Sequence, residues 1–130
     1  GMRRSELLKL TWNNIDHENR TAHLLDTKNG CSRTIPLSTQ AMKVIKSLER
    51  TQYTLFPVSD NAIRLSWDKL RKRANLNNLR FHDLRHEAIS GFFEKGLSIA
   101  EIALISGHKD LRMLQRYTHL RAEDLAKKIG

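Results

Sequence analysis

The last third of the chain carries histidine, arginine and tyrosine residues at spacings that could act on a phosphate. His82 and Arg85 stand three residues apart, so in a helix both project from one face. Gly107-His108 closes an apolar run, and Tyr117 follows nine residues after His108 in a basic segment. Arginine binds phosphate oxygens at two points, imidazole moves protons near neutral pH, and a tyrosine hydroxyl is a nucleophile once its proton is removed. Together these residue types indicate phosphoryl transfer.

Singly, each of these features is common in proteins without such an activity. A Gly-His pair after an apolar run often ends a helix, and a tyrosine near the end of a chain is more often a packing residue. In combination, H-x-x-R, then G-H, then a tyrosine at this distance resembles the catalytic domain of the tyrosine recombinase (phage integrase) family. Two further segments extend the resemblance, GMRRSEL at residues 1–7 and TKNGCSRTIPL at residues 27–37.

The resemblance implies which residues would stabilise charge on a DNA phosphodiester under attack. Arg3 matches the family's first catalytic arginine and Arg85 its second, and Glu6 would support Arg3. His108 would add a hydrogen bond to the same oxygens or orient the phosphate. Fixed donors of this kind are most effective where extra negative charge develops on the non-bridging oxygens. Ser106 stands where the family more often has Leu, a change we expect to loosen packing without touching a reacting group.

The resemblance also implies how protons would move. His82 would accept the proton of Tyr117, because a phenol with a pKa near 10 is mostly unreactive at pH 7. Lys28 would protonate the departing 5′ oxygen. The product would be a 3′-phosphotyrosyl link that a second 5′ hydroxyl can reverse without a cofactor or a metal. Two alternatives stay open at this point: a type IB topoisomerase-like enzyme that relaxes DNA, and a non-catalytic DNA-binding remnant.

Composition favours a nucleic acid partner. The chain has 23 Lys and Arg against 14 Asp and Glu, a net charge of +9 and a pI near 10.1, which suits a polyanion. Charge alone does not separate DNA from an acidic membrane, but no segment is an amphipathic helix of the interfacial type. The helix expected over residues 60–74 is especially basic, and we expect phosphate contacts from five of its residues: Arg64, Lys69, Arg71, Lys72 and Arg73.

Length and composition predict one domain, residues 1–130, with one core. No apolar run reaches about 18 residues, and we expect a cytoplasmic protein. Family members carry helices and a separate core-binding domain before the first arginine, so the resemblance implies an N-terminally truncated catalytic domain. It also implies double-stranded DNA and other recombinase protomers as partners, in a tetramer on DNA for full-length proteins, with no membrane or small-molecule substrate.

Periodicity predicts a mainly α fold with a small three-stranded antiparallel sheet (α+β), like the catalytic domain of a tyrosine recombinase. A short helix over about 4–10 precedes three strands within 13–36, and Asn29-Gly30 marks the hairpin turn. Helices follow over about 38–50, 60–74, 82–95, 98–107, 111–118 and 121–128, and Ser38, Asp60 and Ser98 are the expected N-caps of three of them. Two apolar stripes are expected to be buried, Ala41, Val44, Ile45 and Leu48 in the second helix, and Ile63, Trp67, Leu70 and Ala74 in the third.

A metal site is the least favoured interpretation. His82 and His86 form an H-x-x-x-H pair, which on a helix can hold zinc. The glutamate of the H-E-x-x-H form is missing, and Asp83 is as suited to a helix N-terminus as to a metal. Cys31, the single cysteine, offers neither a disulfide nor a paired metal ligand. We therefore predict no metal and no cofactor.

Overall fold

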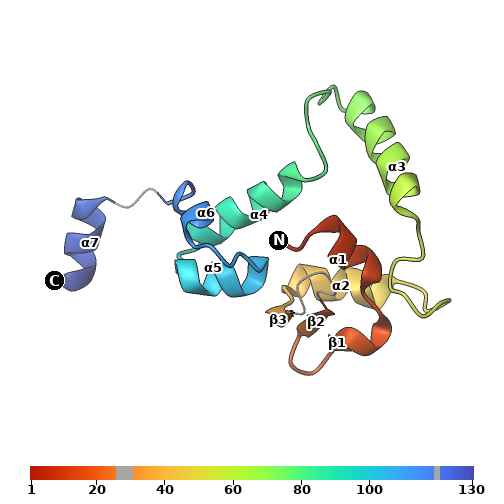
Figure 1. The fold of residues 1–130 in the computed structure, drawn as a ribbon, viewed down its shortest axis with the longest axis horizontal. Helices are drawn as coiled ribbons and strands as arrows, with labels where there is room; N and C mark the ends of the chain where they lie inside the picture. The colour runs from red at the N-terminus through yellow and green to blue at the C-terminus, as the bar shows by residue number, and fades with distance from the viewer. Residues whose placement is uncertain (26–30, 119–120) are drawn as a thin grey trace.

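A sheet with its helices and a separate group of helices make up the chain (Figure 1). The computed structural model describes residues 1–25, 31–118 and 121–130. In chain order the elements are α1 (Arg4–Lys9), η1 (Trp12–Asn14), β1 (Ile15–Asp16), β2 (Thr21–Leu25), β3 (Ser32–Pro36), α2 (Thr39–Ser47), α3 (Asp60–Arg73), α4 (Asp83–Glu94), α5 (Ile99–Ser106), α6 (Arg112–Gln115) and α7 (Ala122–Ile129). The predicted fold class is confirmed.

The three strands form an antiparallel sheet in the order β1-β2-β3. Ala22 pairs with Ile15 on one side and with Ile35 on the other, so three apolar residues lie side by side on one face. Residues alternate between faces along a strand, which places Arg33 on the same face as Ile35. The predicted turn at Asn29-Gly30 lies outside the described residues.

Serine side chains begin three of the helices. Ser38 accepts a hydrogen bond from the backbone N–H of Ala41 at the start of α2, as predicted. Ser59, and not Asp60 as expected, does the same for α3. Ser98 begins α5, which ends at Gly107 with a left-handed φ of 76°. The ends of α5 are therefore fixed by local chemistry, and α5 delivers the Gly-His pair at its C-terminus.

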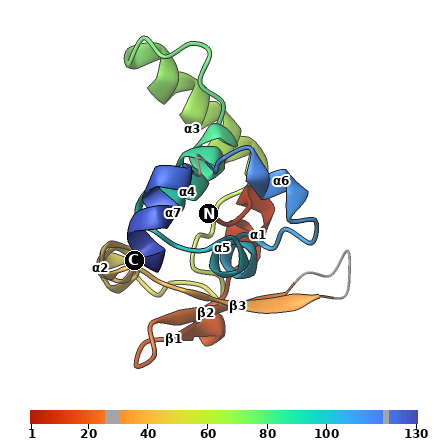
Figure 2. The same cartoon turned by 90° about the vertical axis from the view of Figure 1, so that its left-hand side faces the viewer.

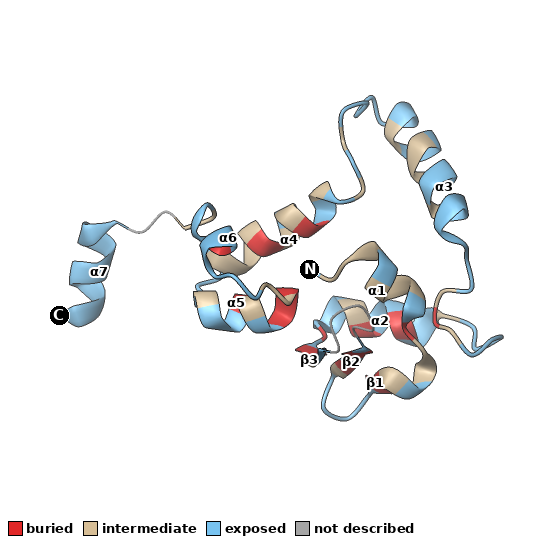
Figure 3. Cartoon of the chain, in the orientation of Figure 1, coloured by how far each residue is buried: buried red, intermediate tan, exposed pale blue. Residues whose placement is uncertain are grey.

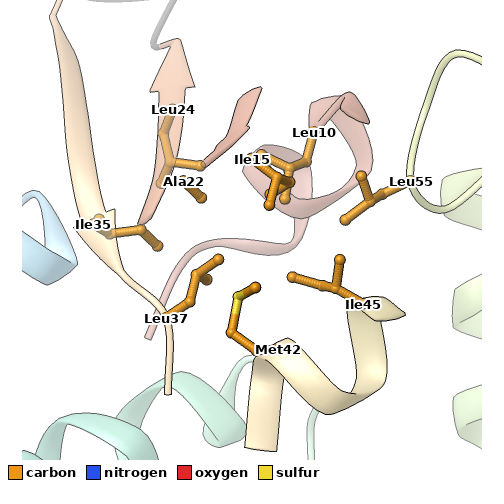
Figure 4. Packing of buried hydrophobic residues seen from close by; sticks show 9 residues of the cluster. All are labelled: Leu10, Ile15, Ala22, Leu24, Ile35, Leu37, Met42, Ile45 and Leu55. Carbon is orange, nitrogen blue, oxygen red and sulfur yellow. The ribbon is translucent and has the colours of Figure 1, made fainter. Parts of the chain in front are cut away.

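The buried residues form two clusters rather than the single core expected. In Figure 4 the apolar faces of the sheet, the end of α1 and α2 point toward one another. Met42 and Ile45 supply the buried side chains of α2, whereas Val44, predicted to be buried, is 45% exposed. Residues 42 and 45 lie three apart and face the sheet, which turns Val44 outward. The helix also ends at Ser47, earlier than the predicted residue 50.

The second cluster joins α4, α5 and α6 through Ile89, Ile102 and Leu114, each of which is almost completely buried. Helix α5 also packs against β3, as Figure 2 shows, so it connects the two clusters. Leu84, near the start of α4, is 45% exposed. The pairing of α5 with β3 brings the end of α5 to Arg33.

Helix α3 stands away from the rest of the chain in Figure 1 and is mostly exposed in Figure 3. The buried stripe predicted for it is therefore wrong: Ile63 and Trp67 are half-buried, and Leu70 and Ala74 are exposed. Trp67 anchors the helix, because its indole N–H donates to the carbonyl of Leu79 at 3.1 Å. An apolar stripe becomes buried only against a facing surface, and among the described residues Trp67 meets such a surface at Phe81, whose ring it contacts edge-on.

The chain ends in two short helices. Tyr117 lies just after α6 rather than inside a helix, as had been expected, and its ring packs on the second cluster. Helix α7 lies beyond α6 and is exposed throughout (Figure 3). No helix in the described residues is both long enough and apolar enough to cross a bilayer.

Candidate active site

Arg85 is the buried centre of the site. It projects from the first turn of α4 and is only 6% exposed. Its guanidinium donates to the carbonyl of Gly1 at 2.6 Å and to the carbonyl of Ser106 at 2.8 Å. Burial and the nearby charge of Arg3 lower its pKa to about 10, so it stays protonated at pH 7. One side chain therefore joins the start of the chain, α4 and the end of α5.

Arg3 is held at the start of α1 by Glu6, as the resemblance implied. The backbone N–H of Arg3 donates to Glu6 Oε2 at 2.7 Å, and the guanidinium reaches Oε1 at 3.4 Å. The Arg3 side chain remains 43% exposed. The backbone bond fixes where the residue lies, while its guanidinium stays accessible to an anion.

Arg33 is a member of this site that sequence reasoning missed. Its guanidinium holds Glu6 at two points, 2.6 Å and 2.9 Å, and its Nε donates to the carbonyl of Ile105 at 3.1 Å. Burial alone would raise the pKa of Glu6, but the hydrogen bonds from Arg33 and from the backbone of Arg3 lower it overall. A signal existed in the sequence, since Arg33 shares the inner face of β3 with Ile35, where a charged residue needs a partner.

Gly107 lies directly against Arg33. A Cβ atom placed on Gly107 would come within 2.8 Å of the guanidinium carbon. The residue also has a left-handed φ, which side chains rarely adopt. The Gly-His turn is therefore packed on an arginine from the sheet, which fixes where the next residue, His108, is presented.

His108 is oriented by Ser106, a contact that corrects the expectation for this position. The hydroxyl of Ser106, a fully buried residue, lies 2.6 Å from His108 Nδ1. Burial lowers the pKa of His108, and the charges of Arg85, Arg3 and Arg116 lower it further. Ser106 therefore touches a predicted catalytic residue through its hydroxyl and binds Arg85 through its carbonyl. A leucine here would keep only the second of these contacts.

Tyr117 is bound at its hydroxyl by two residues. His86 Nδ1 makes a hydrogen bond to this oxygen, and Arg116 donates to it at 3.1 Å. The phenol ring stacks near Phe93, with ring centroids 6.2 Å apart and planes 14° apart. Among the described residues it is therefore His86, and not the predicted His82, that contacts the hydroxyl. The sequence placed His86 only in a disfavoured zinc pair.

His82 lies at the start of α4, beside His86. The two imidazole rings are 5.0 Å apart and nearly perpendicular. Burial, followed by the charges of His86 and Arg85, lowers the pKa of His82. The surroundings of His82 therefore favour its neutral form.

Predicted catalytic residues line two separate hollows. One of about 630 Å³ lies between α1 and the start of α4, and its lining includes Arg3, His82 and Arg85. Another, of about 980 Å³, lies between α4, α5 and α7 and includes Tyr117. Lys28 falls outside the described residues. The described part of the chain holds no group of three His, Cys, Asp or Glu arranged to bind a metal ion.

The predicted DNA-binding residues all lie on α3, but only some of them pair with a carboxylate. Arg71 pairs with Asp68 at 2.9 Å, and Arg64 lies 3.7 Å from the same carboxylate. The other three predicted residues are exposed: Lys69, Lys72 and Arg73. The helix thus presents several cations on a surface that stands away from the body of the chain (Figure 1).

Comparisons with known proteins show which family the chain resembles. The model of the phage integrase family matches residues 1–124. A shufflon-specific DNA recombinase from Escherichia coli is 45% identical, and the match covers 98% of this chain and 34% of the relative. The chain thus spans about a third of that protein's length.

Solved structures give the same answer for the fold. The catalytic domain of bacteriophage HP1 integrase aligns with a TM-score of 0.75 and 26% identity over 98% of this chain and 72% of that one. The XerH site-specific recombinase bound to its difH substrate aligns with a TM-score of 0.73 and 20% identity, over 98% and 42%. The family model covers nearly the whole sequence, and the chain belongs to the phage integrase family.

Proposed function

We propose that this chain is the catalytic part of a site-specific DNA recombinase that cleaves and rejoins DNA through a 3′-phosphotyrosine link at Tyr117. The observation that carries the proposal is the position of Arg85, which binds both the segment before Arg3 and the turn before His108. Two arginines and an imidazole held in this way can bind the non-bridging oxygens of one phosphate. Their positions are set before substrate arrives, as stabilisation of a transition state requires.

The chemistry follows from these groups. The Tyr117 oxygen attacks phosphorus, the bond to the 5′ oxygen breaks, and that oxygen leaves as a hydroxyl after taking a proton from an acid. Lys28 is our candidate for this acid, on the strength of the motif match. The phosphotyrosine conserves the energy of the broken bond, so a second 5′ hydroxyl can rejoin the strand. Arg3, Arg85 and His108 then stabilise the same charge in both directions.

Double-stranded DNA is the proposed substrate, and the protein would act in the cytoplasm, where it meets that DNA. The net charge of +9 and the exposed cations of α3 support phosphate contacts. The E. coli relative is named as a DNA recombinase, and the XerH structure was solved with its difH substrate. Other protomers, in a tetramer on DNA, belong to the proposal because strand exchange joins two sites.

A trapping experiment tests the proposal. The complete gene product is mixed with a pool of nicked duplexes of randomised sequence, in which cleavage at the nick releases a short fragment and prevents rejoining. Covalent complexes are then isolated, and the attached residue and DNA sequence are identified. We expect attachment through a 3′ phosphate at Tyr117, and no adduct from Tyr117→Phe at nearly unchanged DNA affinity.

Tyr53→Phe is the matched control, because Tyr53 is the other tyrosine in the sequence and is 69% exposed. This variant should form the adduct at the rate of the unchanged protein. DNA binding with no adduct at any site would identify a non-catalytic remnant. Relaxation of any supercoiled plasmid, with no exchange between defined sites, would instead point to a topoisomerase-like activity.

A further inference from the structure

The contacts of Tyr117 indicate which group removes the proton of its hydroxyl. The family motif assigns this role to His82. His86 Nδ1 bonds directly to the Tyr117 hydroxyl. Its ring lies 6.1 Å from the phenol ring, with the two planes 26° apart. A general base has to reach the proton it removes, either directly or through one water molecule. Among the described residues, His86 meets this condition.

His86 is also well held. It lies in the first half of α4, one turn after His82, and its side chain is partly buried. The perpendicular ring of His82 contacts it from one side, with centroids 5.0 Å apart. Arg116, which donates to the same Tyr117 oxygen, lies 3.5 Å from His86 Nδ1. The imidazole and the phenol therefore share one environment, and a cation is placed beside the oxygen that would become negative.

We propose that His86 accepts the Tyr117 proton during attack, with Arg116 stabilising the developing phenolate. This inference rests on the proposed function. In the step, the O–H bond of Tyr117 breaks and its proton moves to His86 Nδ1. The oxygen's electron pair forms the bond to phosphorus, the 5′ oxygen departs with the electrons of the broken bond, and the acid described above protonates it. Rejoining returns the proton from His86 to Tyr117.

Several ionisable groups surround His86. On its own helix these are His82 and Asp83, and from the segments packed against it they are Arg116, Tyr117 and His108. Only a neutral imidazole can accept a proton, so a histidine base gives a cleavage rate that rises with pH and then levels off.

The test replaces His86 with asparagine, whose carbonyl oxygen can take the place of Nδ1 and keep a hydrogen bond to Tyr117 but cannot carry the proton away. Cleavage of the trapped substrate is measured in single-turnover reactions between pH 5.5 and 9.5. For His86→Asn we expect a rate lower by about 10²–10⁴-fold at pH 7, the usual contribution of a general base. The rate of the variant should keep rising with pH, because hydroxide must then remove the proton.

Further variants separate proton transfer from positioning. His86→Gly leaves a space that added imidazole can fill, so imidazole should restore part of the rate in proportion to its neutral form. His17→Asn, at an exposed position in the sheet region, is the control for the substitution itself and should behave like the unchanged protein. His82→Asn should keep the levelled pH profile, even if its rate falls.

The proposed function and the proposed role of His86 are tested by different outcomes. An adduct that forms in the unchanged protein and is lost in Tyr117→Phe supports the proposed function whatever His86 does. If His86→Asn then cleaves as fast as the unchanged protein, or faster, the contact holds the tyrosine in place or restrains it, and the inference is wrong. If instead His82→Asn shows the continuously rising profile, the proton acceptor is His82.

Discussion

Replacing Arg33 with methionine should destabilise the fold strongly, although this residue lies on a strand and outside the family motif of H-x-x-R, G-H and tyrosine. Its side chain is 15% exposed and that of Glu6 is 9% exposed, so the pair is largely out of water. Methionine keeps most of the packing volume but removes both hydrogen bonds to Glu6 and the bond to the carbonyl of Ile105. The Glu6 carboxylate is then left with the contacts from Arg3.

The size of the effect follows from that partial loss. Removing one partner of a buried ion pair typically costs about 3–5 kcal/mol. Because Glu6 keeps the backbone N–H of Arg3, we expect a loss in the free energy of unfolding of about 2–4 kcal/mol. With an m-value of about 2 kcal/mol per molar urea, the midpoint should fall by about 1–2 M. Urea unfolding followed by circular dichroism measures this shift.

The loss should also depend on pH in a defined direction. The pKa of Glu6 in the folded protein lies below its ordinary value of 4.5. The pair therefore contributes its full stability above about pH 4.5, and that contribution is lost as the pH falls through the folded-state pKa. The difference between the unchanged protein and Arg33→Met should accordingly be constant from pH 7 to 5 and shrink below pH 4.5.

Arg80→Met is the matched control. Arg80 also pairs with a carboxylate, Asp83 at 3.3 Å, but its side chain is 77% exposed, and exposed pairs contribute little. Its midpoint should move far less than that of Arg33→Met. Equal shifts for the two variants, or a difference that does not change below pH 4.5, would refute the argument that the Arg33–Glu6 pair holds the site together.

Three further expectations concern other parts of the chain. Leu114→Ala empties a fully buried position in the second cluster and should cost about 2–4 kcal/mol in urea unfolding, against far less for the 47% exposed Leu111→Ala. His108 has a lowered pKa, so the folded protein should lose stability as the pH falls below the ordinary value of 6.5; His108→Asn should remove part of that loss between pH 7 and 5.5. DNA affinity should fall with salt at a log–log slope of about −4 to −5. The magnitude of this slope should decrease by about one for Lys69→Ala and for Lys72→Ala. It should decrease by less for Arg64→Ala, because Arg64 pairs with Asp68.

The sequence predicted those parts of the fold that depend on local patterns. Ser38 and Ser98 begin helices because their side chains satisfy free backbone N–H groups a few residues later, and this chemistry is visible in the sequence. The strands were predicted from alternation. The prediction that Leu70 and Ala74 are buried was wrong. Periodicity shows that a helix has an apolar face, but it does not show whether another surface covers that face.

The candidate site shows the same division. Arg3, His82, Arg85 and His108 were selected by motif, and the structure brings them within one group of interacting charges. The partners of these residues were harder to predict, because pairs such as Arg33 with Glu6 join segments that are far apart in the chain. The contact between His86 and Tyr117 depends on how α6 packs against α4, which no local pattern specifies.

The close approach of Arg33 to Gly107 has a consequence for how this sequence can change over time. Asparagine is the residue most often tolerated in place of glycine at a left-handed position, but here its Cβ would meet a guanidinium that is itself fixed by Glu6. A substitution at Gly107 therefore becomes acceptable only after Arg33 has changed, and Arg33 can change at low cost only after Glu6 has lost its charge. The order of permissible mutations runs from the first helix, through the sheet, to the turn before His108, and deep mutational scanning in a Glu6→Gln, Arg33→Met background should reveal it as tolerance at position 107 that the parent chain lacks.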